Sequence, residues 1–200
     1  MYKACVSCHQ RPAGQTDRAW GDSMSISYYT PPPRPADESA REAAVRRSGA
    51  IGLPNHPVLR AIVNQVCRQF HASTCAVTIV YEEWQYVIVG HGIDIGPYSR
   101  RTSFCGHAIL EPTEVFCIAD ASHDPRFAGN PLTESEGGVQ FYAGAPILYD
   151  GQPIGVLCVT DETARPALTP EERRHLDRCA RAVGTAIDQA GAGQSDPLFS

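Results

Sequence analysis

Lysine is almost absent from this sequence: Lys3 is the only one in 200 residues, and the formal net charge is −5. The arginines are scattered, apart from three adjacent pairs. A protein that holds nucleic acid through its phosphates needs clustered positive charge. The composition therefore excludes an electrostatic nucleic-acid binder.

Long apolar runs are also missing. No segment approaches the ~20 apolar residues of a transmembrane helix, and the opening Met1–Cys5 lacks the apolar core of a secretory signal peptide. We therefore expect no membrane partner and a cytoplasmic location. With no internal repeat and 42% hydrophobic residues, the chain predicts one sizeable core plus a tail.

Eight cysteines are present, but the other features of a disulfide scaffold are not. Such scaffolds are short, loop-rich and exported, whereas six of these cysteines lie in periodic apolar segments. We expect the six to be mostly reduced and to pack as small hydrophobic side chains.

The remaining two cysteines form Cys5-Val6-Ser7-Cys8-His9, the C-x-x-C-H pattern of covalent c-type haem attachment. That attachment takes place outside the cytoplasm, so the expected location opposes it. An incomplete metal or redox site and an inert tail are the other interpretations, and a zinc site needs one or two more ligands. The sequence therefore identifies no cofactor and no metal site.

Three segments differ in composition. Residues 1–35 are predicted to be a disordered or weakly docked leader, because Pro31-Pro32-Pro33-Arg34-Pro35 favours polyproline II backbone over helix or sheet. Residues 36–190 contain the periodic apolar segments and are expected to form one domain. Residues 191–200 are polar and predict a flexible tail.

Apolar periodicity predicts two helices and two strands in the first half of the domain. A helix over 37–48, capped by Asp37, has a thin apolar face and is expected to dock against a neighbour or a second chain. A helix from Pro57 to Phe70 repeats apolar residues at helical spacing and belongs in the core. Strands are expected at 75–81 and 86–89, joined through 82–85, and residues 90–101 are expected to be a loop.

The second half begins with a short helix capped by Ser103 and a buried strand at 115–118. Residues 120–138 form a polar connection of nineteen residues, long enough to act as a lid over a binding site. Two strands, 139–148 and 154–161, are joined by the hairpin signal Asp150-Gly151. A capping box at Thr169-Pro170-Glu171-Glu172 begins a helix over 169–190.

In this order, and with particular motifs in place, residues 36–190 resemble a GAF domain. The motifs are Ser103-Phe104-Cys105-Gly106-His107-Ala108-Ile109, Asp120 with Asp124-Pro125-Arg126-Phe127, Phe141-Tyr142-Ala143-Gly144-Ala145-Pro146, and Ile154-Gly155-Val156-Leu157-Cys158-Val159-Thr160-Asp161. The resemblance implies an α+β fold with a five- or six-stranded antiparallel sheet, flanking helices, and a pocket between the sheet and the lid.

The candidate ligand-binding residues follow from that pocket: Phe104, Cys105, His107, Asp120, His123, Arg126, Phe127, Phe141 and Tyr142. Asp120 and Arg126 suit a polar ligand, although local capping and a solvated ion pair explain them equally well. His123 titrates near neutral pH, or is simply solvated. For the aromatic residues and Cys105, ordinary core packing is the alternative.

Thiol chemistry is the enzymatic alternative. Some stand-alone GAF proteins resemble the free methionine-(R)-sulfoxide reductases, which need a thiolate with resolving cysteines nearby. Cys105-Gly106 matches one cysteine of that family, but no cysteine lies from Ala76 to Phe104 or from Ile118 to Leu157. We therefore expect a lone thiol and no enzyme. The same segment lacks the Cys-His pair of bilin-binding relatives, and Cys105 and His107 are poorly spaced for one metal.

The function expected from the resemblance is a cytoplasmic sensory module that binds a small molecule. We expect no output domain after Ala190, and therefore signalling through the flanking helices to a separate output protein, as a homodimer. The alternative is a protein-interaction module with a vestigial pocket, in which helices 37–48 and 169–190 carry the function.

Overall fold

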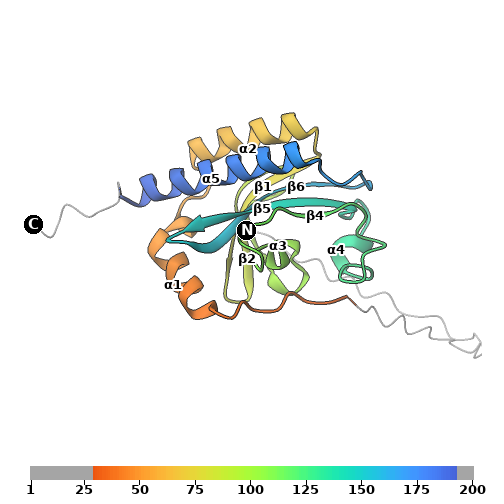
Figure 1. The fold of residues 1–200 in the computed structure, drawn as a ribbon, viewed down its shortest axis with the longest axis horizontal. Helices are drawn as coiled ribbons and strands as arrows, with labels where there is room; N and C mark the ends of the chain where they lie inside the picture. Colours follow the sequence, from red (N-terminus) through yellow and green to blue (C-terminus); the bar gives the residue numbers. More distant parts are fainter. Residues whose placement is uncertain (1–28, 193–200) are drawn as a thin grey trace, which may run out of the picture.

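The computed structural model describes residues 29–192 and has three layers (Figure 1). A six-stranded sheet forms the middle layer. Helices α2 (Pro57–Phe70) and α5 (Pro170–Ala192) lie side by side on one face, and α3 (Phe104–Ala108) and α4 (Pro131–Glu134) lie on the other. The Cys5-x-x-Cys8-His9 motif lies outside the described residues.

Every neighbouring pair of strands is antiparallel, in the order β3-β2-β1-β6-β5-β4. The strands are β1 (Thr74–Tyr81), β2 (Trp84–His91), β3 (Gly96–Ser99), β4 (Phe116–Ile118), β5 (Phe141–Tyr149) and β6 (Gln152–Asp161). The predicted α+β class with a five- or six-stranded antiparallel sheet is therefore confirmed.

Local signals explain the two long helices. Pro57 occupies the first turn of α2, where a missing N–H costs nothing, and the apolar residues that follow are buried. At the start of α5 the Glu172 carboxylate accepts from the Thr169 N–H at 2.8 Å, while the Glu172 N–H donates to the Thr169 hydroxyl at 3.3 Å. This reciprocal pair is the predicted capping box. No helix within residues 29–192 combines the length and apolarity needed to cross a bilayer.

The alternation of side chains along the strands builds two separate cores. On the face covered by α2 and α5, called here the helix face, Val77, Ile79, Ala143, Ile147 and Leu157 are buried. On the face covered by α3 and the lid, called here the lid face, Ala76, Val80, Tyr142, Val156 and Cys158 are buried. Both faces of the central strands are covered, so these strands are apolar throughout.

The β5–β6 hairpin turns at Asp150 and Gly151, whose φ values of 50° and 74° are those of a tight two-residue turn. The predicted turn is therefore confirmed. The pairing then shifts by one residue between Ile147 and Leu148. Such a β-bulge changes which residues of the two strands share a face.

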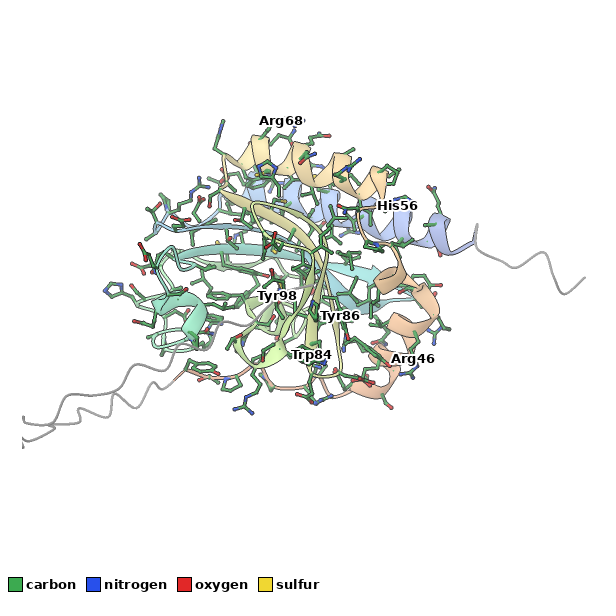
Figure 2. The ribbon with its side chains drawn as sticks, turned by 180° about the vertical axis from the view of Figure 1, so that it is seen from behind. Arg46, His56, Arg68, Trp84, Tyr86 and Tyr98 are labelled. Carbon is green, nitrogen blue, oxygen red and sulfur yellow. The ribbon has the colours of Figure 1, made fainter. Side chains whose placement is uncertain are left out.

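Two predictions in the β1–β3 region were wrong. Trp84 and Gln85, expected in the connection, belong to β2, because Glu82 takes a positive φ of 52° and the chain turns within two residues. Residues 90–101, expected to be a loop, contain the edge strand β3 and the 3-10 helix η2 (Arg100–Thr102). Pro97 is tolerated in β3 because an edge strand leaves one side unpaired. Trp84, Tyr86 and Tyr98 mark this edge in Figure 2.

Helix α1 (Glu38–Ser48), followed by the 3-10 helix η1 (Ala50–Gly52), closes one end of the sheet. Asp37 does not cap it through its side chain, contrary to the prediction. Instead, the fully buried Arg41 donates to the carbonyl of Val80 at 2.6 Å and to Glu38 at 2.8 Å. Arg100, also buried, bonds the same carboxylate. Burial raises the pKa of Glu38, but these two arginines outweigh it and lower the pKa to about 2.

Residues 29–35, called here the strap, cross the lid face and lead into α1 (Figure 1). The Thr30 N–H donates to the Arg126 carbonyl at 3.0 Å, and the Thr30 carbonyl lies 2.9 Å from His107 Nε2. A Cβ built on Gly106 would lie 2.6 Å from Cγ of Pro32, so the helix and the strap touch. This part of the predicted leader therefore docks on α3 and the lid.

Candidate functional site

A cavity of about 110 Å³ lies between the lid face of the sheet and α3. Ala76 and Thr78 of β1 and Cys158 and Thr160 of β6 form its floor, and Phe104, Cys105 and Tyr142 form one wall. Ile93 and Tyr98 from the β2–β3 edge, and Leu132 and Val139 from the lid side, complete it. The lid of residues 120–138 thus contributes one of its own side chains to the cavity.

The lining is almost entirely apolar, and no charged side chain is among the described residues that form it. Its polar groups are already engaged. The Ser103 hydroxyl accepts from the Gly106 N–H at 2.9 Å, which caps α3 as predicted, and it also bonds the side chain of Gln85. An interior of this kind suits a small uncharged molecule, because a buried charge without a partner is costly.

Aromatic rings fill the neighbouring space beneath the lid. Phe104 stacks on Phe127 with ring centroids 4.0 Å apart and on Tyr142 at 5.2 Å. His107 meets Phe127 edge-on at 5.0 Å, and Phe116 lies 5.9 Å from Tyr142. The hollow expected between sheet and lid is therefore largely occupied by side chains, and the 110 Å³ cavity is what remains open.

Two thiols share the cavity wall. Sγ of Cys105 lies 3.9 Å from Sγ of Cys158, and the Tyr142 hydroxyl donates to Cys105 at 3.2 Å. Burial raises the pKa of Cys105, but hydrogen bonds from Cys158, Thr78 and Tyr142 together lower it below its usual value. Hydrogen bonding to the Cys105 sulfur, together with burial, raises the pKa of Cys158. Cys105 is the more acidic of the two thiols, and the expectation that it is a lone thiol was wrong.

Asp120 and His123, both predicted to contact ligand, lie on the outer surface of the lid. Their side chains are 37% and 83% exposed, and His123 Nδ1 lies 2.9 Å from a carboxylate oxygen of Asp120. Hydrogen bonds from Ser122 and His123 lower the pKa of Asp120. The pair is a local contact within one turn of the lid and does not line the cavity.

Arg126 closes the outer side of the aromatic cluster. Its guanidinium donates to both carboxylate oxygens of Asp124, at 2.9 and 2.6 Å, and lies 4.9 Å from the centroid of the Phe116 ring. The hydrogen bond from Arg126 lowers the pKa of Asp124 despite partial burial. Arg126 and Phe127 therefore support the cavity from behind and do not line it.

His107 was expected to be partly exposed, but it is buried against Phe127, with the strap carbonyl of Thr30 on its Nε2. Burial lowers the pKa of His107, and the Thr30 carbonyl opposes this. The imidazole is therefore held neutral and joins α3 to the strap.

Phe141 is the candidate that the structure places on the wrong face for ligand contact. It lies in the helix-face core, with Arg165 5.5 Å above its ring. Phe141 and Tyr142 are consecutive in β5, and consecutive strand residues point to opposite faces. Only one of them can reach the cavity, and that one is Tyr142.

Several lining residues were missed from the sequence. Ala76 and Thr78 alternate with Cys75, Val77 and Ile79 along β1, so the period was visible, but both sets are apolar enough to be buried. Cys158 was missed for the same reason in β6. Tyr98 was assigned to a loop, and Leu132, within the lid, was not among the candidate residues. Their role depends on packing between segments distant in sequence.

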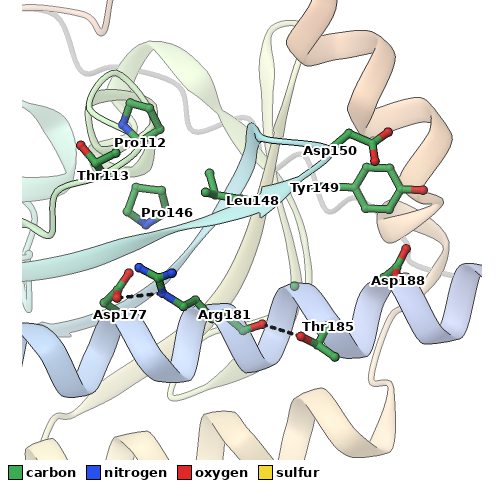
Figure 3. A pocket seen from close by; sticks show the side chains of 11 residues that line it. Pro112, Thr113, Pro146, Leu148, Tyr149, Asp150, Asp177, Arg181, Thr185 and Asp188 are labelled. Atoms are coloured by element: carbon green, nitrogen blue, oxygen red, sulfur yellow. Dashed lines mark hydrogen bonds and ion pairs between the residues drawn. The ribbon is translucent and has the colours of Figure 1, made fainter.

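A larger, more open hollow of about 530 Å³ lies between α5 and the end of β5 (Figure 3). Pro112, Thr113, Pro146 and Leu148 line one side, and Arg181 and Thr185 of α5 line the other. It contains three aspartates, of which Asp177 pairs with Arg181 at 3.0 Å and Asp150 with Arg47 at 3.0 Å. This hollow is called here the α5 groove.

The sequence of this chain is similar to part of a longer protein. A cyclic di-GMP phosphodiesterase from Pseudomonas aeruginosa is 36% identical over 157 residues, which are 78% of this chain and 27% of the relative. The chain thus spans about a quarter of that relative's length.

Solved structures have the same fold. The GAF domain from an Acinetobacter phosphoenolpyruvate-protein phosphotransferase superposes with a TM-score of 0.59 at 21% identity, covering 77% of this chain and 96% of that one. A free methionine-R-sulfoxide reductase from Neisseria meningitidis superposes with a TM-score of 0.54 at 16% identity, covering 85% and 99%.

The model of the GAF domain family matches residues 54–187, from just before α2 to within α5. The match takes in both helices of the helix face, all six strands, α3 and the lid. The resemblance noted in the sequence is therefore confirmed: this chain belongs to the GAF domain family.

Proposed function

We propose that this GAF domain is a sensory module that binds a small uncharged molecule in the lid-face cavity. The observation that carries the proposal is the 110 Å³ apolar space bounded by β1, β6 and α3. An apolar cavity of roughly 150 Å³ is large enough to bind benzene or xenon. The cavity here is smaller, so a ligand no larger than benzene fits without rearrangement, whereas a larger one such as indole requires the aromatic rings beneath the lid to move.

Occupancy reaches the surface through α3. Cys105 lines the cavity, Gly106 and His107 contact the strap, and the strap continues into α1. A ligand that displaces α3 therefore strains the contacts at Pro32 and Thr30. This route uses the N-terminal flanking helix as the transmitter, and it supports a signalling role more directly than the exposed Asp120–His123 pair does.

The output is an enzyme that hydrolyses cyclic di-GMP, and catalysis belongs to that enzyme. The support is the 36% identity to part of a protein named as a cyclic di-GMP phosphodiesterase. The test replaces the matching segment of that phosphodiesterase with the corresponding residues of this chain. Hydrolysis by the chimera is expected to change when an identified cavity ligand is added, and hydrolysis unaffected by that ligand would contradict this output.

Ligand binding is tested on the full chain with benzene and indole as probes, by thermal shift and by ¹H–¹³C NMR of the cavity methyl groups. Ala76→Leu fills the cavity floor and is expected to abolish binding. Thr113→Leu adds similar bulk in the α5 groove and is expected to leave binding unchanged. Mass spectrometry of a solvent extract of the purified protein reports any retained ligand. The proposal would be refuted if neither benzene nor indole bound the parent protein and the solvent extract contained no ligand.

The α5 groove supports a second role, as a docking surface for a signalling partner. It is larger than the cavity, and residues of α1 and α5 contribute its ion pairs. Helices α1 and α5 are also where we place a homodimer. Light scattering measures the oligomeric state, and co-purification with Asp177→Arg, compared with Asp94→Arg at a distant exposed site, tests the groove. The cytoplasmic location stays a prediction.

A further inference from the structure

Cys105 and Cys158 lie 53 positions apart in the sequence, yet their sulfur atoms are 3.9 Å apart. One belongs to α3 and the other to β6, and both line the lid-face cavity. Of the six free cysteines within residues 29–192, these are the two that line it. A pair of thiols that faces a small internal space is a chemical feature that non-covalent ligand binding does not require.

Both thiols are held by rigid elements. The Ser103 cap fixes the start of α3, and Gly106 packs against Pro32 of the strap. Cys158 sits in a central strand, opposite Ala76 of β1 and with its sulfur 3.7 Å from the Ala76 carbonyl. A disulfide requires the sulfurs to approach to ~2.05 Å. They need to move together by about 2 Å, a distance that side-chain rotation in the neighbouring cavity can supply.

The two thiols are not equivalent. The Tyr142 hydroxyl donates to the Cys105 sulfur at 3.2 Å. Hydrogen bonding to its sulfur stabilises a thiolate at Cys105, whereas the hydrogen bond with Cys105 and burial oppose one at Cys158. Since the thiolate is the nucleophile of thiol chemistry, Cys105 attacks first and Cys158 is the resolving thiol.

Three of the other four described cysteines occupy different surroundings. Cys67 bonds the Ala72 carbonyl at 3.0 Å, and burial raises the pKa of Cys75 above its usual range. Cys179 lies on α5, next to His175. These three belong to the helix-face core and its border, and they do not line the cavity.

We propose that Cys105 and Cys158 form a peroxide-reactive dithiol, a modification site for small hydroperoxides that enter the cavity. Cys105 first releases its proton to solvent, its thiolate attacks the terminal peroxide oxygen, the O–O bond breaks, and the leaving alkoxide or hydroxide takes the Cys158 proton. The Cys158 thiolate then displaces hydroxide from the Cys105 sulfenic acid, and the proton released in the first step converts that hydroxide to water. Overall, two thiols and one hydroperoxide give one disulfide, one water and one alcohol, or a second water from hydrogen peroxide.

The size of the cavity selects the oxidant. A space of about 110 Å³ admits hydrogen peroxide or a short alkyl hydroperoxide, while an aryl hydroperoxide does not fit without movement of the lid. The disulfide ties α3 to the sheet beneath the strap. This site goes beyond the proposed function, because the reaction does not depend on a non-covalent ligand.

The experiment uses the full chain with Cys117→Ser. Trypsin leaves Cys105 and Cys117 in one peptide, Thr102–Arg126, and Cys158 in another, so removing the half-buried Cys117 makes the assignment unambiguous. The reduced protein receives one equivalent of hydrogen peroxide, is quenched with an alkylating agent, and is mapped by mass spectrometry without reduction. The expected product is the Cys105–Cys158 cross-linked peptide pair.

Three variants assign the roles of the two thiols and of the Tyr142 hydroxyl. With Cys158→Ser, a sulfenic acid trapped by dimedone is expected at Cys105. With Cys105→Ser, peroxide consumption is expected to fall roughly tenfold, and Cys158 is expected to stay unmodified. Tyr142→Phe removes the hydroxyl that donates to Cys105, so the rise of the Cys105 alkylation rate with pH is expected to begin at a higher pH than in the parent. A purely structural role for this hydroxyl does not predict such a shift.

The proposal is refuted if peroxide oxidises other cysteines while Cys105 and Cys158 stay reduced, or if Cys158 reacts as fast alone as Cys105 does. The Cys117→Ser mapping needs neither serine variant at the site, so it decides the matter even if those variants fail to fold. If both thiols remain free in that map, the proposed modification site is wrong. If the cross-link forms but benzene does not bind, only the proposed sensory function is wrong.

Discussion

The Tyr142 side chain lies directly over the α carbon of Gly144, two residues along the same strand. A Cβ at Gly144 would lie 2.8 Å from Cζ of Tyr142 and 2.7 Å from Cγ1 of Val156, inside van der Waals contact. Glycine at this position lets the phenol lie flat on the sheet and reach Cys105. The motif Phe141-Tyr142-Ala143-Gly144 therefore has a steric reason for its last residue.

Gly144→Ala is expected to destabilise the domain by about 1–3 kcal/mol, because Tyr142 and Val156 must both move in a packed core. Urea unfolding measures the change. The control is Gly52→Ala, where a Cβ meets nothing within 4 Å and φ is not positive; it is expected to stay within about 0.5 kcal/mol of the parent. Equal costs for the two substitutions would contradict this account.

Glu38→Gln is expected to cost about 3–5 kcal/mol, because it leaves the buried guanidinium groups of Arg41 and Arg100 without their counter-charge. Glu42→Gln removes a carboxylate of the same helix that contacts only the exposed Arg34 and is expected to cost less than about 1 kcal/mol. Chemical denaturation at pH 7 compares the two. Similar losses would show that the buried network contributes little.

The Glu38 carboxylate also predicts a loss of stability at acid pH. Because the pKa of Glu38 is lowered in the folded state, its contribution is complete above 4.5, its value when unperturbed, and is lost as the pH falls toward about 2. Stability measured between these values is expected to fall less steeply in Glu38→Gln than in the parent. Parallel curves would remove Glu38 as a cause.

His107 predicts a second dependence on pH. Its folded pKa is lowered, so below about pH 6.5 the unfolded chain takes up a proton that the folded domain resists, and stability falls as the pH falls. Between about pH 6.5 and 5.5 stability is expected to fall, by at most about 1 kcal/mol, and to fall less in His107→Gln. His123→Gln, at a histidine that is 83% exposed, is expected to keep the parent's loss. A full loss in His107→Gln would contradict the assignment.

Gly106→Ala is expected to lift the strap from α3, since the new methyl group meets Pro32 Cγ at 2.6 Å. Hydrogen exchange measures this at the Thr30 amide, which donates to the Arg126 carbonyl in the parent. Exchange there is expected to be at least tenfold faster, while amides in the centre of β1 stay protected. Unchanged protection of Thr30 would show that the strap adapts to the larger side chain.

Much of the fold was predictable because its signals are local. The α2 periodicity, the Ser103 and Thr169 caps and the Asp150-Gly151 turn each act within a few residues, so they can be identified without the rest of the molecule. The Glu82–Glu83 turn was not predictable, because neither residue has the usual preference for positive φ.

The candidate site was predictable only in part. Phe104, Cys105 and Tyr142 line the cavity, but Phe141 does not. Because side chains alternate along a strand, only one of the consecutive residues Phe141 and Tyr142 can reach it. Asp120 and His123 were chosen for their chemistry, yet they face solvent, because a polar lid has an outer surface as well as an inner one. Nothing in the sequence marked Arg41 as a buried residue.

By itself the sequence determined the family, the order of the elements and the hairpin between β5 and β6. Only the tertiary structure decided which thiol meets Cys105. Counting back from the Asp150-Gly151 turn without an irregularity pairs Tyr142 with Val159, whereas the shift between Ile147 and Leu148 pairs it with Thr160. This shift of one residue places Cys158 on the lid face, because side chains alternate between the two faces of a strand. The sequence alone could not decide the face, since both faces of β6 are apolar.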